Sequence, residues 1–311
     1  MQCELAMQRE LAMQREIVMQ RKGLAKTLSR LTGELVLLCG LLAKLTSSAL
    51  AQSPPLRVIE HRLQSQHQAG ETTVRVIRPV KLVPERRYPA LYVLPVEAGD
   101  EQRFGNSITE ALRGELADRW QVVCVFPTFT HLPWYADHPA QAAIRQESYL
   151  LKDVLPLVER EHPVERERAG RWLVGFSKSG WGAYSLLFRH PEVFDRAAAW
   201  DAPLMKDRPN QFGMGEIFGS DAAFADYQLT KLLPNVAPQF RSRTRLVLTG
   251  YDNFRDHHVR FHEELVASRV PHIYRDGPQR KHLWGSGWLP EAVELLAGVA
   301  NQPDPDAQPQ D

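Results

Sequence analysis

Cysteine is scarce in this 311-residue sequence, which contains only Cys3, Cys39 and Cys124. So few cysteines cannot supply the framework of several disulfides that holds small secreted domains together. Net charge is nearly absent too, since 38 lysines and arginines balance 37 aspartates and glutamates. This balance leaves no basic face for a nucleic acid. We therefore expect a fold that depends on its hydrophobic core, and no nucleic-acid partner.

Long apolar runs are also missing. The apolar stretch 35–43 is too short to span a bilayer, and Lys44 ends it. It follows Arg21, Lys22, Lys26 and Arg30 and precedes Ala49-Leu50-Ala51, which is the order of a secretory signal peptide. We expect cleavage near Ala51 and a secreted or periplasmic mature chain with Cys124 as its lone cysteine and without stable membrane insertion. The alternative is an uncleaved membrane anchor.

Four near-copies of one hexamer open the chain: MQCELA, MQRELA, MQREIV and MQRKGL. A repeat this short is not a solenoid unit. It is either a frayed helix or upstream sequence before a true initiator at Met19. We assign residues 1–51 to the hexamers and signal peptide, 52–300 to one folded domain, and 301–311, which lack apolar anchors, to a disordered tail.

Eight apolar runs of strand length recur along the folded domain, with helical patterns between most of the later ones. The expected strands are 56–62, 72–77, 89–94, 122–126, 172–176, 196–200, 245–249 and 272–275, and the expected helices are 107–119, 151–158, 178–190, 255–268 and 291–300. Strands first and alternation afterwards predict an α/β fold, a mostly parallel sheet with an antiparallel start and helices on both faces. The irregular segment 201–240 is expected to be a small cap-like insertion.

The segment WLVGFSKSGWGAYSLL carries the strongest candidate for a catalytic residue. A buried strand, a tight turn and a helix start surround Ser177, with Gly175 two residues before it and Ser179 two after it. This is the setting of a nucleophile elbow, which lifts a serine out of the sheet, although glycine usually stands where Ser179 does. In such an elbow the backbone N–H of Lys178 would donate to the oxyanion. A structural turn is the alternative.

A base and an acid follow the serine in the chain order that is typical of enzymes with a nucleophile elbow. His282 comes after the last strand, and Asp252 ends the strand before it. We predict His282 as general base and Asp252 as its carboxylate partner, with Asp201 as a rival acid and Asp256 as a weaker one. Asp256, His258 and His262 also allow a metal site, but they lack a third distant ligand and the HExxH pattern. The histidines of this stretch are expected at the surface, and nothing indicates a metal or cofactor.

Several motifs in order resemble the esterase family of the α/β-hydrolases, the esterase D-like group. The similar segments are PTFTHLPWYAD, ESYLLKDVLPLVEREHPV, GFSKSGWGAYSLLFRHPEVF, TGYD and KHLWGSGW, within roughly residues 56–300. The resemblance implies an eight-stranded α/β-hydrolase fold, ester hydrolysis or acyl transfer to another alcohol, and a triad of Ser177, Asp252 and His282. The sequence departs from the family pattern at YVLPVEAGD, where family members commonly have His-Gly. Pro95 has no N–H, so Val96 or Glu97 must give the second oxyanion donor.

The sequence therefore predicts a secreted serine esterase acting through an acyl-enzyme on a small-molecule ester or an acylated carbohydrate. Trp134, Trp181 and Trp284, with Tyr135 and Trp288, lie near predicted loop ends and are candidates for stacking on substrate. Packing in the core is the alternative for each. A catalytically silent module with the same fold is the competing function, because of Pro95 and Ser179.

Overall fold

The structure is a computed structural model that describes residues 58–300. The hexamers, the expected signal peptide with its cleavage near Ala51, and the expected tail 301–311 lie outside the described residues. No helix within residues 58–300 is long and apolar enough to cross a membrane.

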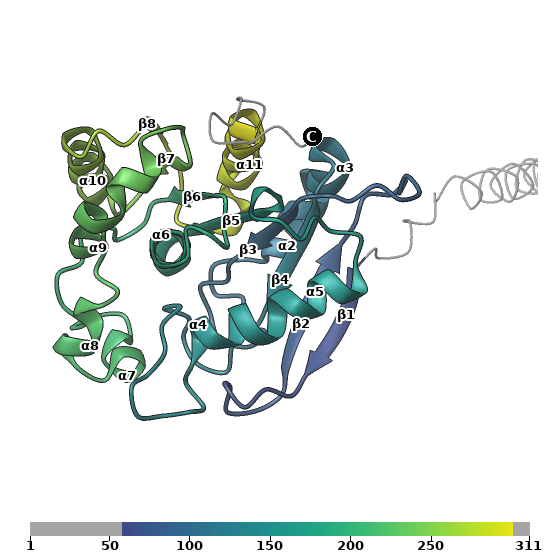
Figure 1. Cartoon of the computed structure of the whole chain (residues 1–311), viewed down its shortest axis with the longest axis horizontal. Helices are drawn as coiled ribbons and strands as arrows, with labels where there is room; N and C mark the ends of the chain where they lie inside the picture. Colours follow the sequence, from purple (N-terminus) through teal and green to yellow (C-terminus); the bar gives the residue numbers. More distant parts are fainter. Residues whose placement is uncertain (1–57, 301–311) are drawn as a thin grey trace, which may run out of the picture. The chain divides into compact units, whose positions relative to one another are not determined.

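Eight strands form one sheet, as predicted (Figure 1). They are β1 (Val58–Leu63), β2 (Thr72–Ile77), β3 (Ala90–Val93), β4 (Val123–Pro127), β5 (Arg171–Phe176), β6 (Arg196–Trp200), β7 (Leu246–Tyr251) and β8 (His272–Gln279). Their order is β1-β2-β4-β3-β5-β6-β7-β8. β2 pairs antiparallel with both β1 and β4, and the remaining pairs are parallel. Residues after β5, β6 and β7 therefore meet at one edge of the sheet.

Helices cover both faces of the sheet. In β3, Ala90 and Tyr92 belong to one hydrophobic core, whereas Leu91 and Val93 belong to a second core. The alternation follows from the two-residue period of a strand. Residues of α5 (Leu155–Glu161), α6 (Ser177–Arg189), α9 (Leu229–Val236) and α10 (Arg255–Ala267) pack in the first core, and those of α2 (Ser107–Arg113), α3 (Leu116–Trp120) and α11 (Trp288–Ala300) in the second.

Two helical segments differ from the prediction. The expected helix 107–119 is split into α2 and α3, because Glu115 takes a left-handed φ of 48°. The stripe 151–158 lies in a longer segment that runs from α4 (Gln146–Tyr149) through a π-helical turn (Leu150–Val154) into α5. Pro156 has no N–H for an α-helical bond, and the π turn directly before it accommodates that loss.

The insertion 201–240 contains α7 (Met214–Phe218), α8 (Asp221–Ala225), α9 and a 3-10 turn (Ala237–Phe240). Most of its aromatic residues, namely Phe218, Phe224, Tyr227 and Phe240, are buried in the first core. Phe212 is the exception, with 51% of its surface exposed.

Candidate active site

The turn between β5 and α6 has the geometry of a nucleophile elbow. Ser177 follows the last residue of β5 directly and holds a left-handed φ of 52°, a strained conformation for a serine. The turn is so tight that a Cβ on Gly175 would lie 2.4 Å from the backbone of Ser179. Only glycine fits there, as the motif requires.

Ser179, which stands in the place of the usual glycine, completes the turn. Its hydroxyl donates to the carbonyl of Phe176 (2.9 Å) and accepts the N–H of Phe176 (3.0 Å), and the side chain is fully buried. Both polar groups at the end of β5 are thereby satisfied. The departure from the family pattern therefore fits the elbow.

The imidazole of His282 is bonded to Asp201, not to Asp252. Its Nδ1 lies 2.6 Å from Oδ2 of Asp201, whose side chain is completely buried. Asp252 instead accepts the backbone N–H of His282 at 2.9 Å. The prediction of Asp252 as the partner of the imidazole is therefore wrong, and the rival Asp201 holds that position. β6, which leads to Asp201, lies beside β5, whereas β7 lies one strand farther from Ser177.

Asp201 is held as an anion by donors around it. Burial alone would raise the pKa of its carboxyl, but hydrogen bonds from His282 and from backbone N–H groups of residues 252–254 hold the pKa below its usual value. Asn253 N–H lies 3.0 Å and Phe254 N–H 2.7 Å from Oδ1. The backbone carbonyl of Asp201 also accepts the N–H of Ser177 at 3.2 Å. Asp201 thus contacts both His282 and the elbow.

Ser177 and His282 line one cavity of about 540 Å³. No hydrogen bond joins their side chains among the residues described; such bonds often form only once substrate is bound. Much of the wall is apolar and comes from separate loops: Phe104, Leu132, Pro203, Phe212 and Phe254. The sequence reasoning missed this wall. Its one usable signal was that Phe104 and Phe254 belong to loops after β3 and β7, at the same edge of the sheet as Ser177.

The backbone N–H groups predicted for the oxyanion come from the first turn of α6, for Lys178, and from the loop after β3, for Glu97. Lys178 and Glu97 both line it, and their backbone N–H groups have no hydrogen-bond partner within residues 58–300. Val96, the other candidate, is buried and lies on the second, smaller cavity instead. Burial lowers the pKa of the Lys178 ammonium.

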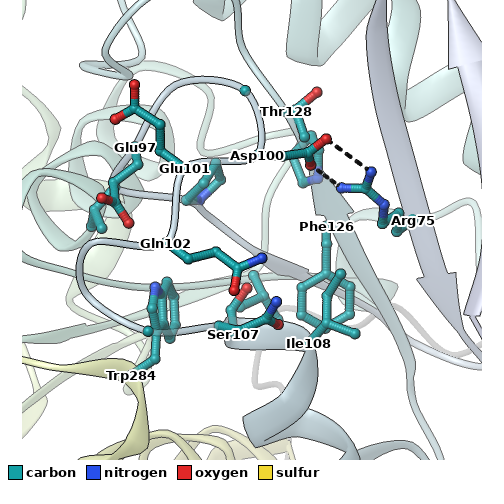
Figure 2. Close-up of a pocket in the computed structure, with 17 residues that line it drawn as sticks. Arg75, Glu97, Asp100, Glu101, Gln102, Ser107, Ile108, Phe126, Thr128 and Trp284 are labelled. Carbon is teal, nitrogen blue, oxygen red and sulfur yellow. Dashed lines mark hydrogen bonds and ion pairs between the residues drawn. The ribbon is translucent and has the colours of Figure 1, made fainter.

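The Glu97 carboxylate does not compete for the oxyanion position. Its oxygens accept the backbone N–H groups of Arg103 (2.7 Å) and Phe104 (3.2 Å), so it closes its own loop. Figure 2 shows this loop around the smaller cavity, of about 70 Å³, with Asp100 paired to Arg75 of β2. The hydroxyl of Tyr135 donates to the carbonyl of Pro95 at 2.5 Å. These contacts fix a loop that lacks the usual His-Gly.

The predicted substrate-stacking residues are core residues. Trp134 and Trp181 are fully buried and pack edge to face, with ring centroids 5.4 Å apart. Trp284 is 3% exposed, packs on Phe176, and lines the smaller cavity and not the one shared by Ser177 and His282. Tyr135 and Trp288 are buried as well. The prediction that these side chains contact substrate is therefore wrong. Burying such large apolar side chains in the core is more favourable than exposing them to solvent.

The histidines of α10 do not form a metal site. His258 is 2% exposed and its Nε2 accepts the N–H of Ala202, whereas His262 is bonded to His272 at 2.7 Å. Within residues 58–300 no group of three potential ligands is present. The prediction that these histidines lie at the surface is wrong for His258.

Comparison with known proteins places this geometry in context. The family described as "Putative esterase" matches residues 65–272. No protein of the curated set matches the chain.

Solved structures share the fold at low sequence identity. A ferulic acid esterase is 23% identical with a TM-score of 0.59, over 78% of this chain and 96% of its own. An S-formylglutathione hydrolase from Staphylococcus aureus is 17% identical with a TM-score of 0.62, over 77% and 98%. One from Agrobacterium tumefaciens is 17% identical with a TM-score of 0.61, over 81% and 99%. At these identities the likeness concerns the fold.

Proposed function

Because this chain belongs to the "Putative esterase" family of α/β-hydrolases, we propose that it is a serine esterase whose triad consists of Ser177, His282 and Asp201. The observation that carries the proposal is the strained Ser177 on the same cavity as His282, whose ring is bonded to a buried carboxylate. A hydroxyl alone is a poor nucleophile, and this arrangement supplies the base and the orienting acid that it needs.

The reaction follows from these positions. Nε2 of His282 takes the proton from Ser177 Oγ as the oxygen attacks the ester carbonyl, and the imidazolium that forms is stabilised by Asp201. The N–H groups of Lys178 and Glu97 stabilise the oxyanion. His282 returns the proton to the departing alcohol, which leaves an acyl group on Ser177. A water deprotonated by His282 then releases the acid.

The apolar lining of the cavity favours a substrate ester that carries an apolar, aryl-sized group beside the scissile bond. Phe104, Phe212 and Phe254 form much of its wall, and planar rings pack well against aromatic faces. The ferulic acid esterase with the same fold acts, by its name, on an aromatic ester. A carbohydrate stays a candidate for the alcohol part of the ester, but the buried tryptophans do not support it.

Labelling by a fluorophosphonate probe tests the proposal. The native protein should be labelled and should hydrolyse a short-chain aryl ester, and Ser177→Ala should lose labelling completely while keeping the native thermal unfolding midpoint. A folded native protein that is neither labelled nor active would support the silent-module alternative instead.

A further inference from the structure

Two adjacent histidines of α10 contact the loop that carries Asp201. The Nε2 atom of His258 accepts the backbone N–H of Ala202 at 2.8 Å. Nδ1 of His257 accepts the N–H of Met205 at 2.9 Å. Both imidazoles therefore bind the segment that directly follows the carboxylate partner of His282.

The segment needs such support. Asp201 holds a left-handed φ of 41°, which costs free energy for a residue with a Cβ. Its position sets the distance between its carboxylate and His282, and its carbonyl receives the N–H of Ser177. A small shift of this residue would therefore disturb the base and the elbow together.

Residues at the start of α10 both donate hydrogen bonds to this segment and accept hydrogen bonds from it. Just before the helix, the N–H groups of Asn253 and Phe254 donate to the Asp201 carboxylate. One turn later, His257 and His258 accept N–H groups from the residues after it. An imidazole accepts a hydrogen bond only when it is neutral, since both nitrogens of the cation are donors.

We propose that His257 and His258 are positioning residues that hold Asp201 against His282 by accepting backbone N–H groups of the segment 202–205. The inference rests on the proposed triad. The surroundings agree with neutral rings: His258 is almost fully buried, and its Nδ1 has no hydrogen-bond partner within residues 58–300. A buried imidazole with one unsatisfied nitrogen is costly, and a role in holding the acid accounts for its presence.

Burial lowers the pKa of both rings, for His258 to about 4. The charged and titratable groups acting on His258 are Asp201, His257 and Asp276; those acting on His257 are Lys206, Arg260, Asp256 and Asp201. Both shifts favour the neutral rings that accept the N–H groups of Met205 and Ala202.

Substitutions that keep or remove the acceptor test the inference on the full chain. The amide oxygen of His258→Gln replaces Nε2 and that of His257→Asn replaces Nδ1, whereas His258→Leu and His257→Leu accept no hydrogen bond. We expect His258→Leu to lower kcat for a short-chain aryl ester about ten- to hundredfold, since small misplacements of a catalytic group have effects of this size. His258→Gln should stay within about threefold of the native protein.

The split between kcat and KM separates positioning from simple loss of stability. A displaced Asp201 weakens the chemical step but leaves the wall that binds the ester in place. We therefore expect kcat to fall in His258→Leu with KM changed less than about twofold, and neither value to change by more than about threefold in His258→Gln. His262→Gln on the same helix, which bonds His272 and not the segment, is the matched control.

An unchanged kcat in both leucine variants would overturn the inference. So would equal losses in His258→Gln and His258→Leu, because volume and not the acceptor would then matter. The NMR signal of the proton between His282 and Asp201 gives a readout without substrate, and it should be lost in the leucine variants. A native protein with this signal but without Ser177-dependent hydrolysis would defeat the proposed function separately.

Discussion

Asp201 serves the site through its side chain and its backbone at once. The carboxylate binds the ring of His282, and the carbonyl binds the N–H of Ser177. Asp252, the acid that the chain order favours, is a neighbour of the same histidine through the backbone only. Only the Asp201 carboxylate is bonded to the imidazole, so only its charge stabilises the imidazolium directly.

Asparagine substitutions distinguish them. Asp201→Asn keeps the volume but removes the charge that orients His282 and stabilises its cation, so kcat should fall by about 10³–10⁴. Asp252→Asn keeps a side-chain oxygen that can accept the backbone N–H of His282 and removes only a charge that is not bonded to the imidazole, so kcat should stay within about tenfold of the native value. Ester hydrolysis at a fixed pH measures both, and a larger loss in Asp252→Asn than in Asp201→Asn would show that the triad is assigned wrongly.

The insertion 201–240, between β6 and β7, supplies one aromatic side chain to the cavity, that of Phe212. Phe212 sits at a left-handed φ of 56°, and its carbonyl accepts the indole N–H of Trp134 at 3.0 Å. The backbone is thus tied to a core residue, while about half of the surface of Phe212 stays exposed and the residue lines the cavity. This arrangement suits a ring that contacts substrate.

Phe212→Ala should therefore act on substrate choice. We expect kcat/KM for a methyl ester of a phenylpropanoic acid to fall about three- to tenfold, as expected for one lost aromatic contact, with methyl butanoate changed less than twofold. Val266→Ala on α10, another exposed apolar residue, is the control. Equal losses on both esters would mean that Phe212 supports the loop and does not select the substrate.

At the scale of the whole molecule, buried histidines make the fold sensitive to acid. Burial lowers the pKa of His258 to about 4, and burial with the nearby charges of His61 and Arg78 lowers the pKa of His162 to about 4. The folded pKa lies below the unfolded value of about 6.5. The stability that these neutral rings confer is complete above pH 6.5 and is lost as the pH falls toward 4.

Each of these histidines should lower the free energy of unfolding by about 2 kcal/mol between pH 7 and pH 5. His162→Gln cannot take up a proton and should lose less stability over this interval than the native protein does. Urea unfolding at the two pH values measures the difference. Equal losses in both proteins would mean that His162 titrates normally in the folded state.

How much of this the sequence could predict depends on the range of the interactions. The eight strands were predictable because the two-residue alternation and apolar runs are local signals. Gly175 and Ser177 were predictable because the elbow is a local geometric requirement. The expected export and cleavage near Ala51 remain predictions.

The sequence by itself determined the fold class, the elbow and His282 as the candidate base, since each depends on neighbours in the chain. Only the tertiary structure decided that Asp201 binds the imidazole and that phenylalanines and not tryptophans line the cavity. It also decided that His258 is buried against the segment that follows Asp201. These outcomes depend on which strands lie side by side and which faces pack, because residues 56 and 81 positions apart in the chain meet only then.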